Sequence, residues 1–240
     1  MKQMELTARL KQIADMMPPG FSVADIGTDH GYLPIYLVVQ GISPCVLACD
    51  LRPGPLERAK AHVREYGLEE QIHCRLSDGL EGVVLDDASV VVMAGIGGRL
   101  CSDLLLQESR RDKNILPSLK VLLLQPQSDL ALVRHTVHRV GLGIAQEAMI
   151  EDRGKRYTIL LCRPGNEAYA QEIEYQYGKK LIEAKDPILG QELQERRRTI
   201  EGLLEQLRQG EKSGSAACAA RCAELEQERQ RIEEVLRRWT

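Results

Sequence analysis

The stretch SVADIGTDHGYLPIYL, residues 22–37, decides the fold of this chain. An apolar run ends at Asp25, and Gly27 and Gly31 follow before a helical pattern begins. A dinucleotide fingerprint, G-x-G-x-x-G, would need glycines where Asp29 and Tyr32 stand, and the Asp29 carboxylate would face a diphosphate. The stretch therefore predicts a nucleotide-type turn that serves a ligand other than a dinucleotide.

An acidic residue followed by alternating small positions resembles the first motif of class I methyltransferases, (D/E)-x-G-x-G-x-G. Here the motif reads Asp25, Gly27, Asp29 and Gly31, with Asp29 in place of one glycine. The cofactor of those enzymes, S-adenosyl-L-methionine, carries an ammonium and a sulfonium but no phosphate, so carboxylates attract it. These four residues are therefore predicted to bind S-adenosyl-L-methionine.

The next three apolar runs also end in polar or glycine residues. LACD ends at Asp50, followed by Leu51, and an acid there can accept both ribose hydroxyls. The third run ends in LSDGL, and the fourth in MAGIGG, residues 93–98. A single Asp at a strand end is more often a helix N-cap than a ligand, but four ends in this order indicate one cleft. The further cofactor residues predicted from these runs are Asp50, Leu51, Asp78, Gly79, Ala94 and Gly95.

Short apolar runs alternate with helical patterns through the first two thirds of the chain. Helical patterns occupy roughly residues 32–40, 54–67, 98–109 and 129–140, and a first helix ends at the PPG of residues 18–20. This alternation predicts an α/β, Rossmann-like fold with a mostly parallel sheet. The last two runs are joined only by EDRGKR and must form an antiparallel hairpin. The runs lie at residues 21–26, 44–50, 71–76, 89–94, 119–124, 144–150 and 157–163.

Composition changes after Pro164-Gly165, where Glu, Gln and Arg replace the apolar runs. We therefore predict a methyltransferase domain over residues 1–163 and a helical, coiled-coil-like domain over residues 164–240. Residues 166–185 are expected to form a lead-in helix, and GEKSG, residues 210–214, a turn between two antiparallel helices. Two apolar stripes would join these helices: Leu189, Leu193, Ile200, Leu203, Leu204 and Leu207 on one, and Cys218, Cys222, Leu225, Ile232, Leu236 and Trp239, interrupted by Arg229, on the other.

Composition and charge exclude several classes of protein. The formal charge is −3 over 240 residues, which lacks the general basic signature of nucleic-acid binding but leaves local basic patches open. The seven cysteines form no CxxC pair and indicate free thiols rather than a disulfide framework or a metal site. The sequence begins with an amphipathic stretch rather than a signal peptide, and no apolar run is long enough for a membrane span. We expect a cytoplasmic protein without a metal.

Five segments together resemble the TrmK family of bacterial tRNA (adenine-N1)-methyltransferases, which modify adenine 22. The segments are VADIGTDHGYLPIYLV, DLRPGPLERA, RLSDGLEGV, MAGIGG and LLQPQSD, within residues 5–163. GTDH and AGxGG are specific to that family, and Ile96 replaces the more usual Met in AGMGG. The resemblance implies tRNA as the partner, S-adenosyl-L-methionine as the cofactor and a helical C-terminal domain.

Methylation of adenine N1 requires that the base be exposed and held in line with the methyl group. Asp29 is the candidate carboxylate near that methyl, although it could instead cap the next helix. His30 and Tyr32 are candidates for the catalytic base pocket, and a packed loop histidine is an equal alternative. Arg9 is either a pocket residue or a solvated surface arginine. The substrate-binding candidates are Arg9, Gly97, Gly98, Arg153 and Lys155.

RNA also needs cationic groups, although each such group taken alone is more often part of a solvated face. The candidates are Arg110, Arg111 and Lys113, then Arg134, His135, His138 and Arg139, then Arg153, Lys155 and Arg156 in the hairpin turn, and finally Arg196, Arg197 and Arg198.

Two other functions remain open at this point. One is a small-molecule methyltransferase whose C-terminal helices serve dimerisation, and the other is a non-catalytic scaffold that binds RNA or protein. An intact cofactor cleft would disfavour the scaffold, and a broad positive face would favour RNA over a small substrate. A monomer is the favoured oligomeric state.

Overall fold

The computed structural model describes residues 4–84, 87–209 and 215–239, and the chain divides into two compact units. The first unit is Met1–Ala170 and the second is Gln171–Thr240, so the division falls a few residues after the expected boundary at Arg163. The predicted turn at residues 210–214 lies outside the described residues.

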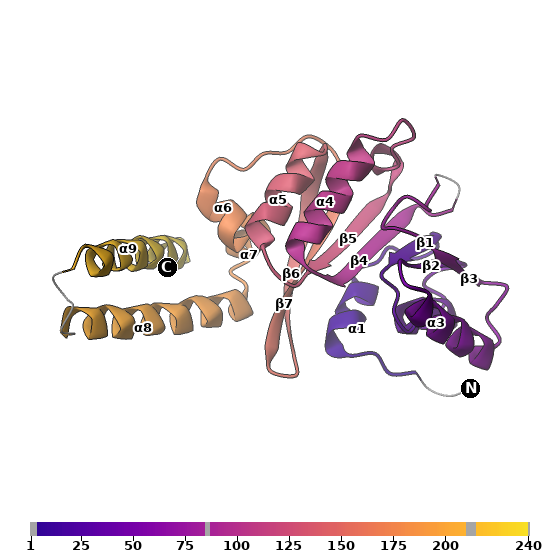
Figure 1. Ribbon diagram of the computed structural model, residues 1–240, viewed down its shortest axis with the longest axis horizontal. Helices are drawn as coiled ribbons and strands as arrows, with labels where there is room; N and C mark the ends of the chain where they lie inside the picture. Colours follow the sequence, from indigo (N-terminus) through magenta and orange to yellow (C-terminus); the bar gives the residue numbers. More distant parts are fainter. Residues whose placement is uncertain (1–3, 85–86, 210–214, 240) are drawn as a thin grey trace. The chain divides into compact units, whose positions relative to one another are not determined.

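The first unit is built on a seven-stranded sheet with the order β3-β2-β1-β4-β5-β7-β6 (Figure 1). The first five strands of this order are parallel, and β7 runs antiparallel to both β5 and β6. The predicted α/β class and the terminal hairpin are therefore confirmed. The strands are β1 (Val23–Ile26), β2 (Val46–Asp50), β3 (Ile72–Leu76), β4 (Val90–Ile96), β5 (Val121–Pro126), β6 (Leu142–Asp152) and β7 (Lys155–Pro164).

Helices cover both faces of the sheet because the inner strands are apolar on both sides. Ile13, Ile35 and Val63 from the first three helices pack with Val23 and Val92 in one buried core. The alternate strand residues are buried as well, under α4 and α5, which lie side by side in Figure 1. The helices of this unit are α1 (Ala8–Asp15), α2 (Tyr32–Val39), α3 (Pro53–Tyr66), α4 (Gly98–Ser109), η1 (Leu116–Ser118) and α5 (Leu130–Arg139).

The strand order reverses at β1, which pairs with β2 on one side and with β4 on the other. Chain connections diverge from such a point, so a crevice opens beyond the carboxyl ends of the two strands. The four runs whose ends carry Asp25, Asp50, Asp78 and Gly95 are neighbours in this sheet. The topology therefore gathers the predicted site residues at one edge.

Gly98 lets the β4–α4 turn pack closely against the β5–α5 turn. A Cβ atom added to this buried glycine would lie 2.0 Å from the carbonyl oxygen of Ser128 and 3.0 Å from Cβ of Asp129. The Gly98 N–H also donates to Ser128 Oγ at 3.2 Å. Gly98 therefore sets the spacing of two backbone segments, whereas the sequence had suggested contact with the substrate.

The second unit is helical, but its lead-in segment is not the single helix that the sequence predicted. α6 (Glu172–Tyr177) and α7 (Lys179–Glu183) are separated by Gly178, which has φ +89°. A backbone in that region interrupts the helix, and glycine adopts it readily.

The two long helices are α8 (Pro187–Gln209) and α9 (Ala216–Arg237). Ion pairs of Arg196 with Glu228 and of Arg208 with Glu226 join them. The expected apolar stripes face inward at Leu189, Leu193, Ile200, Leu204, Leu225 and Ile232, all buried. Among the residues the structure describes, no helix is long and apolar enough to cross a membrane.

We expect Gly98→Ala to destabilise the protein by about 1–3 kcal/mol, because backbone atoms must move to admit the methyl group. Gly54→Ala is the matched control, since a Cβ at Gly54 in α3 would meet nothing within 4 Å. Chemical denaturation of both variants measures the difference. Equal stability of the two variants would show that the turn tolerates the methyl group.

Candidate functional site

A cleft of about 660 Å³ lies at the carboxyl ends of β1 to β4. It brings together most of the residues predicted from the sequence: Arg9, Asp25, Gly27, Asp29, His30, Tyr32, Asp50, Leu51, Asp78, Gly79, Ala94 and Gly95. Gly31, Gly97, Gly98, Arg153 and Lys155 do not line it. The four strand ends therefore converge as predicted. Of the substrate-binding candidates, only Arg9 lines this cleft.

Asp50 connects the two loops beside it. Its Oδ2 accepts the backbone N–H of Asp29 at 3.3 Å, and its Oδ1 accepts that of Arg52 at 2.9 Å. The side chain is buried, with 7% of its surface exposed. A carboxylate offers about four lone-pair positions, so these two bonds leave acceptor capacity for ligand hydroxyls.

Asp25 is an acid held in a buried position at the end of β1. Burial raises its pKa to about 6, and the neighbouring Asp50 carboxylate adds to that effect. The ionised form therefore weakens the fold, and a cation placed nearby would recover part of this cost. An acid in this environment suits a positively charged ligand.

Asp29 adopts φ +51°, a left-handed conformation that Asp and Asn tolerate better than most residues. Its half-exposed carboxylate lies 3.4 Å from Arg58 Nη2 and 3.6 Å from His30 Nε2. The N-cap of α2 is Gly31, which makes no side-chain cap bond. Helix capping therefore does not explain this carboxylate, and it stays available to the cleft.

Arg9 reaches the cleft from α1 and is held there by Gln125, a fully buried residue of β5. Arg9 Nη1 donates to Gln125 Oε1 at 2.5 Å, and the same oxygen accepts the Gly95 N–H at 3.2 Å. The Arg9 guanidinium carbon also lies 5.6 Å from the centre of the Tyr157 ring. The structure thus places Arg9 on the wall of the cleft rather than on a solvated surface.

Apolar side chains complete the cleft. Leu51 and Leu100 are 59% and 52% exposed and both line it, as does Ile96. Exposed leucines beside an acid suit a ligand that combines a flat ring with hydroxyl groups. Among the described residues, no cluster of His, Cys, Asp or Glu is arranged to hold a metal ion.

Sequence reasoning missed several lining residues, among them Thr28, Arg52, Ser77, Leu100 and Gln127. Most of them flank a residue that was predicted, so a window of one or two positions around each strand end would have found them. Gln125 belongs to the LLQPQSD segment that carries the family resemblance, but it lies inside an apolar strand and its position alone gave it no role in the site.

Two of the basic candidates for RNA contact are buried. Arg134 is 1% exposed and its Nε donates to Glu147 Oε1 at 2.7 Å. His138 is buried with its Nε2 at 3.4 Å from Glu167. These side chains hold α5 to β6 and to the segment after β7, so their assignment to RNA contact was wrong. Arg153 and Lys155, in contrast, are exposed at the two-residue turn between β6 and β7.

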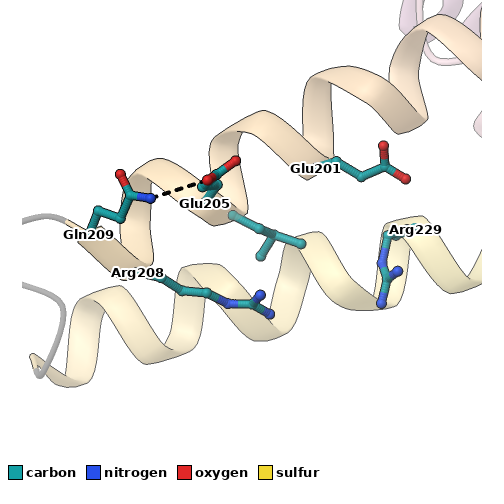
Figure 2. A pocket seen from close by; sticks show the side chains of 6 residues that line it. Glu201, Glu205, Arg208, Gln209 and Arg229 are labelled. Atoms are coloured by element: carbon teal, nitrogen blue, oxygen red, sulfur yellow. Dashed lines mark hydrogen bonds between the residues drawn. The ribbon is translucent and has the colours of Figure 1, made fainter.

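The helical unit has a smaller hollow of about 440 Å³ between α8 and α9 (Figure 2). Glu201, Glu205, Arg208 and Arg229 line it, and Gln209 donates to Glu205 across one turn. The hollow has mixed charge and none of the strand-end residues. The cleft at the sheet edge is therefore the candidate functional site.

Residues 6–160 match the model of a family described as "Methyltransferase domain". A curated relative, the tRNA (adenine(22)-N(1))-methyltransferase of Bacillus subtilis, is 33% identical over 166 residues, which cover 69% of this chain and 68% of the relative.

Solved structures are similar over nearly the whole chain. The structure of the B. subtilis M1A22 tRNA methyltransferase TrmK has a TM-score of 0.83 at 26% identity, covering 97% of this chain and 99% of that one. A Streptococcus pneumoniae protein solved in complex with S-adenosyl-L-methionine has a TM-score of 0.83 at 29% identity, covering 97% of this chain and 100% of that one. The similarity therefore extends through both units.

We expect Asp25→Asn to stabilise the folded protein above pH 6 by up to about 3 kcal/mol. The folded pKa of this acid is raised, so the unfolded chain loses its proton first. Stability therefore falls as pH rises from about 4 to 6 and stays lower above that. The asparagine side chain cannot ionise, so the variant should lack this loss of stability. Near pH 3.5, where Asp25 is protonated in the folded wild type, the two proteins should have similar free energies of unfolding. Urea denaturation across pH measures the difference, and parallel stability curves would contradict it.

Proposed function

We propose that this protein transfers a methyl group from S-adenosyl-L-methionine to N1 of adenine 22 in tRNA, because the chain belongs to the family of tRNA (adenine(22)-N(1))-methyltransferases. The observation that carries the proposal is the cleft, in which four strand ends place acids and glycines around one ligand-sized space. An intact cleft of this kind disfavours the alternative of a non-catalytic scaffold. Family membership favours tRNA over a small-molecule substrate.

The residues of the cleft suit the parts of S-adenosyl-L-methionine. Asp50 is placed to accept the ribose hydroxyls, and Leu51 offers an apolar surface beside the adenine ring. Asp78 is available to the adenine amino group. Asp25 and Asp29 give the cleft the negative charge that an ammonium and a sulfonium require. Arg9, held by Gln125 next to Gly95, is assigned to the substrate side.

The cofactor supplies an electrophilic methyl carbon on a sulfonium. The lone pair of adenine N1 forms the new bond to that carbon, and the pair of the carbon–sulfur bond returns to sulfur. The ring becomes cationic and can later lose a proton from N6, so a strong general base is not needed. The chain contributes by positioning and by electrostatics, with Asp29 beside the developing cation.

We infer further that tRNA is held outside the cleft by exposed cations and by the helical unit. The exposed Arg153 and Lys155 at the β6–β7 turn are the candidates in the first unit. A monomer in the cytoplasm is consistent with this function, and both remain part of the proposal.

The direct test uses unmodified tRNA transcripts and labelled S-adenosyl-L-methionine. We expect one methyl group per tRNA, located at N1 of adenine 22 by digestion and mass spectrometry. Replacement of adenine 22 by guanine in the transcript should abolish transfer. Methylation of the replaced transcript at an equal rate would overturn the proposed position.

Asp29→Asn should reduce kcat by about 10²-fold while leaving cofactor affinity within a few fold. Asn keeps the shape and tolerates the φ of +51°, so the loop should still form. The lost charge would act mainly in the transition state. Single-turnover methylation gives the rate, and calorimetry gives the affinity. A rate within about threefold of wild type would remove Asp29 from catalysis.

A chain truncated after Ala170 should bind S-adenosyl-L-methionine as the full chain does but methylate tRNA poorly. The first unit is compact and contains every residue of the cleft. Circular dichroism controls for folding, and the KM for tRNA is the measurement. Unchanged tRNA kinetics would assign the helical unit another role.

A further inference from the structure

Three aromatic rings lie together beside the cleft. The ring centres of His30 and Tyr32 are 5.4 Å apart, those of Tyr32 and His62 are 5.4 Å apart, and those of His30 and His62 are 5.8 Å apart. The planes differ by only 15–24°. A column of three rings would put its end members about twice as far apart as its neighbours. The three rings therefore do not form one straight column: each is stacked with an offset against the other two, and we call the three together the ring cluster.

His62 joins the ring cluster from a different element. It lies on α3, and its Nδ1–H donates to the backbone carbonyl of His30 at 2.9 Å. A carbonyl can only accept, so this bond requires the proton on Nδ1 and fixes the orientation of the ring. Nothing in the motif that carries His30 and Tyr32 signals this residue.

The ring cluster extends from the wall of the cleft to the surface. His30 and Tyr32 line the cleft, but His62 does not. Tyr32 is 45% exposed, and His30 and His62 are half-buried. Exposed aromatic surface next to a site for a nucleic-acid base is suited to stacking, which is worth roughly 5- to 100-fold in affinity per base.

Arg58 adds a cation on the same face of α3. It precedes His62 by four residues, so the two side chains are neighbours on the helix. Its side chain is 52% exposed, and Nη2 lies 3.4 Å from Asp29 Oδ1. An exposed, weakly held guanidinium beside stacked rings matches a phosphate next to a base.

We propose that the ring cluster and Arg58 form a subsite for a nucleotide adjacent to the methylated adenine. Its base stacks over Tyr32 and His62, and its phosphate contacts Arg58. His62 is a positioning residue that holds the strand leading away from the cleft. This proposal rests on the proposed function, since it assumes that an RNA base enters the cleft.

Three variants of His62 separate stacking from the hydrogen bond. His62→Phe keeps an aromatic ring, His62→Gln keeps a donor for the His30 carbonyl, and His62→Ala keeps neither. We expect the Ala and Gln variants to raise the KM for tRNA roughly 5- to 100-fold, and the Phe variant to stay within about threefold of wild type. Cofactor affinity and kcat at saturating tRNA should change less than about twofold. The proposal would be overturned if the Gln variant kept the wild-type KM for tRNA and the Phe variant did not. It would also be overturned if the Ala variant left that KM unchanged.

A fluorescent base reads the stacking directly. tRNA carrying 2-aminopurine at either neighbour of adenine 22 should lose fluorescence on binding to the wild type, and less on binding to His62→Gln. Equal quenching in the two proteins would overturn the subsite. Failure of the wild type to methylate adenine 22 would instead overturn the proposed function, so the two failures are distinguishable.

Arg58→Ala supplies an independent measurement. If Arg58 contacts a phosphate, the slope of log Kd for tRNA against log salt should fall by about one. A role only in pairing with Asp29 would leave that slope unchanged and would overturn the assignment of Arg58.

Discussion

The geometry of the site depends on the hydrogen bonds that the Asp50 carboxylate accepts from two backbone N–H groups. It accepts N–H groups from the loop after β1 and from the turn that starts α3, and it is buried while doing so. The loop that carries Asp29 and His30, and that leads to Tyr32 at the start of α2, is therefore tied to the end of β2. Because β2 pairs with β1 in parallel, the register of the sheet also sets the distance between these groups. A ligand that binds Asp50 meets a site already formed.

Much of this arrangement was predictable because it follows from local chemistry and topology. Parallel strands place their carboxyl ends at one edge, so Asp25, Asp50, Asp78 and Gly95 had to converge once the alternation of runs and helices was recognised. The short link between the last two runs required the β6–β7 hairpin. These inferences needed only periodicity and chain length.

The remaining features depend on long-range packing, which periodicity does not encode. Arg134 looks like any surface arginine in the sequence, yet Glu147 meets it in the interior. Gly98 looks like part of a ligand loop, but its lack of a Cβ serves the approach of Ser128. The break at Gly178 divides a segment whose composition suits one helix. In each case, a partner distant in sequence or a single backbone angle decides the outcome.

The distribution of charge around the cleft addresses a conflict in the proposed reaction. The methyl donor is cationic and favours acids, whereas tRNA is a polyanion that acids repel. The buried Asp25 and Asp50 line the cleft together with the exposed Asp29 and Asp78, whereas the exposed Arg58 and Arg99 lie on helices beside it. A neutral base can enter such a space, but a phosphate gains more by staying at the cationic rim. In the proposed reaction, the same arrangement would hold the cofactor, keep the backbone of the RNA outside, and favour entry of the base that is to be methylated.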